Sequence, residues 1–322
     1  MQRRVGAKLY FANSTQYHIF TLTNYKAIMT TRRSFIKTSA MLTAGMLAAP
    51  QLFAYNKKYI GLQLYTIRDA MSANPVAALA KVAQIGYTSV EAATYTGTEK
   101  FYGMAAKDFS KVLKDNGLFM PSSHYRLGEE LTDGKETQGT IMHDWQRAVD
   151  DAAEVGVKYM VCAWLSEPER GFLTHYGQIG ERLNKAGEIC KKAGIQLCYH
   201  NHDFEFIKQD GKFPYEYLLI KADEDLVKME LDLYWFTKAG QNIVPLFARY
   251  PGRFPLWHIK DMDNTPKKNF TEVGNGTIDF KEIFKHAKDA GLQYYFVEQD
   301  VCPGDPFDSI TQSIAYIKKK LI

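Results

Sequence analysis

The chain has 322 residues, of which 46% are hydrophobic, 13% aromatic and 24% charged. This composition excludes disordered, collagen-like and coiled-coil proteins and is typical of a globular fold. Residues 1–54 hold seven basic and no acidic side chains, so the other 268 residues, with 33 basic and 36 acidic groups, have a net charge of −3. Because nucleic-acid binding needs a basic face, we expect no nucleic-acid partner.

An export signal is predicted at the N-terminus. Arg32 and Arg33 precede a mostly apolar stretch, residues 38–49. Pro50 follows, and a possible cleavage site lies after the small residue Ala54. At a rise of 1.5 Å per residue this stretch spans only about 18 Å, too short for a bilayer core of roughly 30 Å. The arginine pair resembles a twin-arginine signal. We therefore expect a signal peptide and extension over residues 1–54, with Met29 as an alternative start, a periplasmic location, and no stable membrane anchor after cleavage.

From residue 59 onward, short apolar runs alternate with amphipathic stretches. The predicted strands are residues 59–64, 88–92, 118–123, 158–163, 195–200, 226–232, 254–259 and 293–298. The predicted helices are residues 75–85, 105–116, 143–155, 175–193, 213–221, 243–250, 280–290 and 306–320. Several of these helices run into a glycine, which adopts the left-handed conformation that ends a helix.

Eight such strand–helix units predict an α/β fold of the single (β/α)8 TIM barrel type over residues 55–322. The alternative is a doubly wound open sheet, which usually carries a glycine-rich ligand loop after its first strand. Residues 64–69 contain no glycine, and this favours the barrel. Of the four cysteines, Cys162 and Cys198 fall in predicted strands and are expected to pack as small hydrophobes, and the spacing assigns no disulfide.

Polar residues gather at the carboxyl ends of the predicted strands, where a TIM barrel carries its active site. Side chains alternate along a strand, so residues two positions apart, such as His200 and His202, share a face. The intervening Leu231 and Ile259 are expected to face the helices. The strand-end residues are Glu91, His124, His200, His202, Glu230, Asp232, His258, Lys260, Glu298 and Asp300.

Four of these residues, from four different strands, predict one divalent metal ion, Mn²⁺, Zn²⁺, Mg²⁺ or Co²⁺. Imidazole and carboxylate ligands together suit such an ion. Without a cation, neighbouring carboxylates such as Asp232 and Glu298 would repel each other, and one would have to be protonated. The predicted ligands are His200, Asp232, His258 and Glu298.

Four segments in the predicted strands and at their ends have a recognisable order along the chain: Gly-Leu-Gln-Leu-Tyr-Thr (61–66), Glu-Leu-Asp-Leu (230–233), His-Ile-Lys-Asp (258–261) and Phe-Val-Glu-Gln-Asp (296–300). Together they resemble the sugar phosphate isomerase/epimerase superfamily, the xylose-isomerase-like barrel. The resemblance covers about residues 58–320, and it rests on the order of these segments along eight units rather than on any one of them.

The resemblance implies a metal held by Glu, Asp, His and Glu at the ends of strands five to eight. The last three correspond to Asp232, His258 and Glu298, whereas the first aligns with His200, so this sequence departs from the family pattern. In the epimerases two glutamates move a proton between two faces of the substrate. With His200 in place of one glutamate, a histidine base or a different reaction becomes an alternative. Lys260 resembles a substrate-contacting position.

We therefore predict a metal-dependent isomerase or epimerase that acts on a small-molecule carbohydrate, a sugar or keto-sugar, through an enediolate. The predicted catalytic residues are Glu298, His200, His202 and Lys260. The predicted substrate-binding residues are Glu91, His124, Lys260 and Trp235, and Glu205 is a weaker candidate. The glycine-flanked residues 274–276 are the nearest match to a phosphate-binding loop.

Three alternatives remain open from the sequence. The first is a metal-dependent lyase or dehydratase that acts on keto-sugars or keto-glycosides. The second is a non-catalytic periplasmic sugar-binding barrel. The third, a relative of the abasic-site endonucleases, is opposed by the net charge of −3 outside residues 1–54 and by the predicted export signal.

Overall fold

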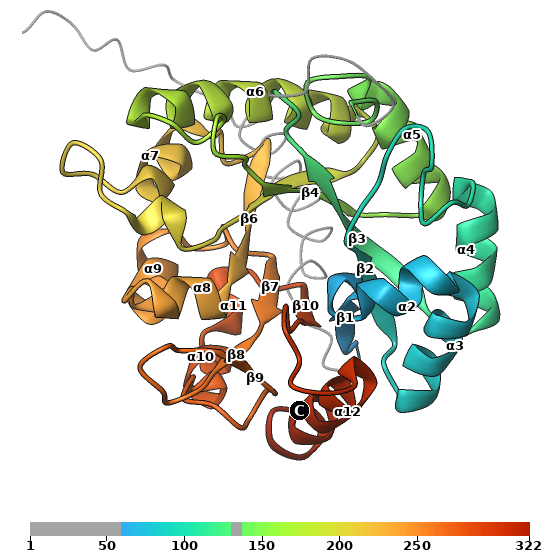
Figure 1. Cartoon of the computed structure of the whole chain (residues 1–322). Helices are drawn as coiled ribbons and strands as arrows, with labels where there is room; N and C mark the ends of the chain where they lie inside the picture. Colours follow the sequence, from blue (N-terminus) through green and yellow to red (C-terminus); the bar gives the residue numbers. More distant parts are fainter. Residues whose placement is uncertain (1–58, 130–136) are drawn as a thin grey trace, which may run out of the picture. The chain divides into compact units, whose positions relative to one another are not determined.

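The computed structural model describes residues 59–129 and 137–322, so the predicted signal segment, residues 1–54, lies outside the described residues. Eight parallel strands form a closed barrel, in the order of the chain, with the last strand paired to the first (Figure 1). The strands are β1 (Gly61–Gln63), β2 (Ser89–Ala92), β3 (Phe119–Arg126), β4 (Tyr159–Trp164), β5 (Gln196–His200), β6 (Val227–Asp232), β7 (Leu256–Ile259) and β10 (Tyr294–Val297). This confirms the predicted α/β, (β/α)8 fold.

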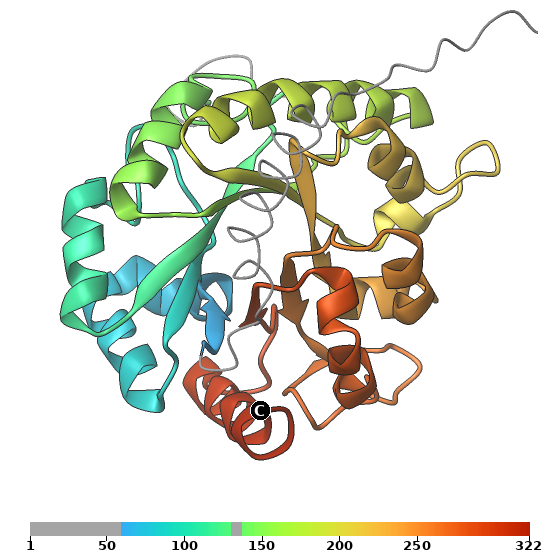
Figure 2. The ribbon, with the colours of Figure 1, turned by 180° about the vertical axis from the view of Figure 1, so that it is seen from behind.

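The helices that join the strands surround the barrel (Figures 1 and 2). They are α3 (Pro75–Ile85), α4 (Ala106–Asp115), α5 (Trp145–Val155), α6 (Leu173–Lys192), α7 (Pro214–Lys221), α9 (Ile243–Arg249), α10 (Phe280–Lys285), α11 (Ala287–Ala290) and α12 (Pro306–Lys320). The bounds of α3 and α12 are those predicted, because both begin with a proline behind a capping side chain. Asn74 Oδ1 accepts from the amide of Ala77 at 3.0 Å, and Asp305 Oδ1 accepts from Phe307 at 2.9 Å.

Short elements at the carboxyl ends of the strands were not predicted. They are η1 (Leu64–Ile67), α2 (Arg68–Ala73), η2 (Phe204–Phe206), α8 (Leu233–Lys238) and the hairpin of β8 (Asp261–Met262) and β9 (Phe270–Thr271). Most span one or two turns, too few residues for a hydrophobic period to be recognised. They belong to the βα loops, the part of the barrel that carries the active site.

The glycine-flanked segment after β7 is not a free phosphate cradle. The carboxylate of Asp261 accepts hydrogen bonds from the amides of Gly274, Gly276 and Ile278, at 2.9–3.2 Å. A Cβ atom at residue 276 would collide with this carboxylate, which explains the glycine there. The amides that could have bound an anion are therefore used to fold the loop.

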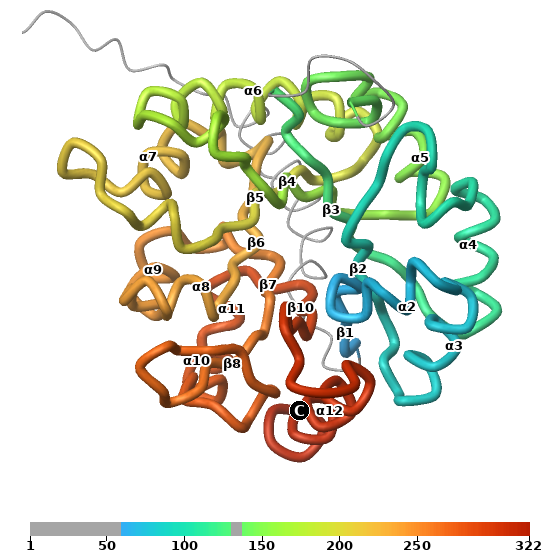
Figure 3. Tube along the Cα trace, viewed as in Figure 1, coloured from blue at the N-terminus to red at the C-terminus, as the bar shows by residue number. Residues whose placement is uncertain are grey.

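The interior of the barrel is apolar at one level and polar above it. Val161, Cys198, Leu256 and Phe296 form a fully buried apolar cluster inside the barrel. Leu231 and Ile259 belong to the other core cluster, with the helices, as the alternation predicted. β5, which contributes one residue to each level, is labelled between β4 and β6 in Figure 3. Inward positions further along the strands carry the polar residues described below.

All four cysteines are free, and three of them, including Cys162 and Cys198, are buried. The predicted packing of Cys162 and Cys198 as small hydrophobes is confirmed. Among the described residues, no helix is long and apolar enough to cross a membrane.

Candidate active site

A layer of polar side chains lies inside the barrel, beyond the apolar cluster. Parallel pairing places neighbouring members opposite one another, for example Gln63 opposite Glu91 and His200 opposite Glu230. The layer therefore follows from strand register, because a shift of one residue would turn these side chains toward the helices. Each member is at most 8% exposed, and together they are Gln63, Glu91, His124, His200, Glu230 and His258.

Two carboxylates tie the three imidazoles of this layer together. Glu91 Oε2 lies 2.6 Å from His258 Nε2, and Glu230 Oε2 lies 2.8 Å from His124 Nε2 and 3.0 Å from His200 Nδ1. Burial opposes protonation of His124, but the charges of Glu91 and Glu230 outweigh it and raise the pKa of His124 to about 9. Burial lowers the pKa of His200 well below its usual value.

A second polar group lies at the strand ends around the ammonium of Lys260. Its Nζ is 2.6 Å from Asp300 Oδ1, 2.7 Å from Glu298 Oε2 and 3.1 Å from Asp232 Oδ2. Glu298 Oε2 also lies 2.8 Å from His258 Nδ1. Burial would raise the pKa of Glu298, but Lys260 and His258 hold it well below its usual range. Lys260 is 1% exposed, and three carboxylates surround its charge.

The structure brings three of the four predicted metal ligands into one group, and the fourth, His200, lies beside them. Ligand atoms of Asp232, His258 and Glu298 all lie within 4.8 Å of one another. His200 Nε2 lies 3.8 Å from Asp232 Oδ2. A second group of ligand atoms, which we call the inner group, shares His258 with the first and lies further inside the barrel. It comprises His124, His200, Glu230 and His258.

We call Asp232, His258 and Glu298 the outer group, and with the neighbouring His200 these residues fit a divalent ion. His258 directs Nδ1 toward the outer carboxylates and Nε2 toward Glu91, while His200 directs Nε2 toward Asp232 and Nδ1 toward Glu230. A histidine that ligates a metal commonly donates its other N–H to a carboxylate, which fixes the tautomer and the ring. Glu91 Oε1 and Glu230 Oε1 are buried and have no hydrogen-bond partner among the described residues, so the layer has acceptor atoms that its own donors leave unused.

A cavity of about 520 Å³ opens onto the outer group. Its lining includes His200, His202 and Glu298, predicted to be catalytic, and His124, Lys260 and Trp235, predicted to contact substrate. Glu91, also predicted to bind substrate, does not line this cavity. It is fully buried beneath it, where its carboxylate contacts His258 and His124. Its position therefore suits the support of a ligand rather than contact with substrate.

Some site residues were given no role by the sequence. Gln63 donates to Glu91 Oε2 at 2.7 Å, and Glu230 contacts three imidazoles. Glu230 shares the inward face of β6 with Asp232, a signal that was available. Arg170 and Phe204 line the cavity from the loops after β4 and β5, and no sequence pattern indicated them.

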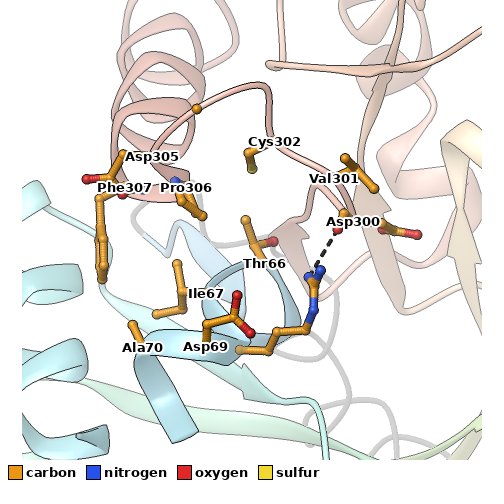
Figure 4. A pocket seen from close by; sticks show the side chains of 12 residues that line it. Thr66, Ile67, Asp69, Ala70, Asp300, Val301, Cys302, Asp305, Pro306 and Phe307 are labelled. Carbon is orange, nitrogen blue, oxygen red and sulfur yellow. Dashed lines mark hydrogen bonds between the residues drawn. The ribbon is translucent and has the colours of Figure 1, made fainter. Parts of the chain in front are cut away.

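A second cavity of about 390 Å³ adjoins the first at Asp300 (Figure 4). It lies between the η1–α2 segment and the start of α12. Arg68 donates to the backbone oxygen of Asp300 at 3.0 Å across it. With the carboxylates of Asp69 and Asp305 also in its lining, this cavity is acidic.

Glu205 lies beside the cavity and has a structural part. Its Oε1 accepts from the Tyr199 hydroxyl at 2.7 Å, and its Oε2 accepts from the amide of His202 at 2.9 Å. Burial raises the pKa of Glu205 to about 7, against a lowering effect of these hydrogen bonds. Glu205 thus fixes the turn that presents His202.

The Glu205→Gln variant should change how stability depends on pH. Because the folded pKa, about 7, exceeds the unfolded value of 4.5, the contribution of Glu205 is complete below pH 4.5 and is lost as pH rises through 7. Glutamine keeps the shape and does not ionise. Relative to wild type, the variant should gain on the order of 3 kcal/mol in unfolding free energy between pH 4.5 and 8, measured by urea denaturation. Glu188→Gln, on the exposed face of α6, is the control, and a difference independent of pH would contradict the assignment.

Comparison with known proteins agrees with this architecture. Residues 79–320 match the family described as the xylose isomerase-like TIM barrel. The crystal structure of a sugar phosphate isomerase/epimerase from Parabacteroides distasonis has 32% sequence identity and a TM-score of 0.71, and the match covers 83% of this chain and 96% of that one. The IolI protein, crystallised with a bound zinc atom, has the same fold, with 15% identity, a TM-score of 0.62, and coverage of 81% of this chain and 97% of that one.

Among curated proteins, an inosose dehydratase from Clostridium perfringens is 27% identical over 161 residues. The match covers 44% of this chain and 54% of that protein, so this chain spans about half the length of the curated relatives it matches. These similarities confirm the resemblance predicted from the strand-end segments. With its closed barrel and a family match over residues 79–320, the chain belongs to the xylose isomerase-like TIM barrel family.

Proposed function

We propose that this chain is a divalent-metal-dependent enzyme that moves a proton on a sugar or keto-sugar, as an isomerase or epimerase acting through an enediolate. One observation carries the proposal: ligand atoms of Asp232, His258 and Glu298 converge beside a cavity of about 520 Å³. Small-molecule sites have volumes of roughly 300–1,000 Å³. The relatives named sugar isomerase/epimerase and inosose dehydratase support a carbohydrate substrate.

Each polar group of the cavity has a task in this reaction. A divalent ion, when bound, stabilises the negative charge that develops on the sugar oxygens. Glu298 accepts the proton on Oε1, because its contacts with His258 and Lys260 both use the other carboxylate oxygen, Oε2. His202, whose pKa burial lowers to about 3, is neutral, and its buried Nδ1, without a partner among the described residues, can form a hydrogen bond with a sugar hydroxyl. Lys260 donates to a substrate oxygen.

A dehydratase is the second candidate. The curated relatives are named inosose dehydratases, and β5 presents His200 where the family resemblance implies a glutamate. Loss of a β-hydroxyl needs an acid to protonate the leaving oxygen, and the protonated Lys260, whose side chain lines the cavity, can supply that proton. The same proton abstraction by Glu298 would begin either reaction.

Solvent exchange tests the proposed function. The purified protein, with its metal content measured by mass spectrometry, is incubated in D₂O with ketoses such as fructose and with inosose. We expect deuterium to enter the carbon next to the carbonyl and expect a chelator to abolish this exchange. NMR then separates isomerised, epimerised and dehydrated products. Tight sugar binding without exchange would favour the non-catalytic sugar-binding barrel.

We also propose that residues 1–54 direct twin-arginine export to the periplasm. The support is the Arg32–Arg33 pair before a short apolar stretch and the absence of acidic residues from this segment. In cell fractionation the chain should be found in the periplasm, and Arg32→Lys with Arg33→Lys should retain it in the cytoplasm. Periplasmic delivery of the double variant would refute the proposal.

A further inference from the structure

Four aromatic rings form a wall on one side of the cavity, and we call Trp164, His202, Phe204 and Trp235 the aromatic wall. Trp164 is the last residue of β4, and the other three follow β5 and β6, the next strands around the barrel (Figure 3). The ring of His202 lies 4.9 Å from that of Trp164, 5.5 Å from that of Phe204 and 5.6 Å from that of Trp235. All four line the cavity.

The wall runs outward from the reaction centre. Its inner end adjoins the proposed metal site, since His202 lies 4.9 Å from the His200 ring and Lys260 Nζ lies 5.6 Å from the Trp235 ring. Its outer end is Trp164, which is 44% exposed. Trp164 is thus two ring-to-ring steps away from His200. A sugar whose carbon reacts beside Glu298 occupies the inner end, and the outer ring is left for something attached to it.

Two buried polar atoms of the wall lack partners. The Trp235 Nε1 donor and the His202 Nδ1 atom have no hydrogen bond among the described residues. Buried polar atoms are normally satisfied, so these two indicate a ligand that supplies both acceptors and donors. Hydroxyl groups do both, and the apolar faces between them suit the C–H faces of a sugar ring.

The charges at the wall disfavour a phosphorylated ligand. Arg170 stacks on Phe204 at 4.1 Å and lies 3.8 Å from Glu167, while Lys238 stacks on Trp235 at 4.4 Å and lies 3.6 Å from Asp203. Each cation already has an acidic neighbour, and each holds a ring in place. The adjoining cavity beyond Asp300 is lined by the carboxylates of Asp69, Asp300 and Asp305, which also disfavour a phosphorylated ligand there.

We infer that the aromatic wall is a subsite for a second, neutral sugar residue, so that the substrate class is a glycoside or disaccharide of the reacting sugar. This inference rests on the proposed function for the position of the reacting sugar. Stacking on Trp164 and hydrogen bonds to Trp235 and His202 would bind the second ring. The enzyme would then act on a sugar that is still glycosidically linked.

Fructose and two disaccharides that carry fructose at the reducing end, lactulose and maltulose, test the inference. Calorimetry with the metal-loaded protein should give about tenfold tighter binding for at least one disaccharide than for fructose. Trp164→Ala should reduce this ratio to about one, and Trp164→Phe should restore part of it. Trp235→Phe, which keeps an aromatic ring but removes the N–H donor, should lower the ratio. Phe172→Ala is the matched control, because this ring is 75% exposed and does not line the cavity.

Binding and exchange separate the two proposals. A disaccharide preference that depends on Trp164, without deuterium exchange into any of the three sugars, would support the subsite and count against the proposed reaction. Exchange into fructose with equal affinity for all three sugars would leave the reaction standing and overturn the subsite. Failure of both disaccharides to bind, or a preference that Trp164→Ala leaves intact, also overturns it.

Discussion

The Glu298→Gln variant is expected to lose metal and solvent exchange together. Glu298 Oε2 contacts both His258 Nδ1 and Lys260 Nζ, at 2.8 and 2.7 Å, and an amide there carries no charge for a cation. Loss of a positioned general base alone typically costs 10²–10⁴-fold in rate, and loss of the ion adds to it. Deuterium exchange into the sugar should fall by about 10³-fold or more, with metal content well below that of wild type.

The control for this variant is Glu154→Gln, an exposed carboxylate in α5, which should keep wild-type metal and exchange. Glu230→Gln separates the two groups of ligand atoms that share His258. If Glu230 orients His200 from behind, metal affinity should fall by about 10–100-fold, as for other residues that support a ligand. Wild-type metal content in Glu298→Gln, together with its complete loss in Glu230→Gln, would place the ion in the inner group instead.

Removing the charge of Lys260 should destabilise the metal-free protein strongly. Lys260→Met keeps most of the side-chain volume but leaves Asp232, Glu298 and Asp300 buried together without their shared cation. Breaking a buried ion pair by removing one partner costs about 3–5 kcal/mol. We expect a loss of this size in unfolding free energy, measured by urea denaturation in the presence of a chelator.

Two further variants test whether the loss of stability comes from the missing charge of Lys260. Lys281→Met, on an exposed site of α10, should change stability little. Adding Asp300→Asn to Lys260→Met should recover part of the loss, since it removes one of the unpaired charges. Equal stability of Lys260→Met and Lys281→Met would show that the three carboxylates do not depend on this ammonium.

Local patterns located the regular strands and helices of the barrel, although the helix predicted over residues 280–290 is divided into α10 and α11. The bounds of α3 and α12 could be predicted because a capping side chain and a proline mark their first turn. The bounds of the short helix α8 could not be predicted, because its six residues show no period and it begins directly after the last residue of β6, Asp232. Asp232 has two roles at this junction. Its Oδ1 caps α8 by accepting a hydrogen bond from the amide of Trp235 at 2.8 Å, and its Oδ2 faces Lys260.

The sequence by itself determined the barrel and the gathering of Asp232, His258 and Glu298 at one end, because parallel strands in a closed sheet share that end. Only the tertiary structure decided which atoms meet. Glu91 and His258 are 167 positions apart, and strand register places their side chains 2.6 Å from each other. The same register puts Glu91 beneath the cavity rather than in it. Contacts of this kind depend on closure of the whole barrel, a long-range event that no local pattern encodes.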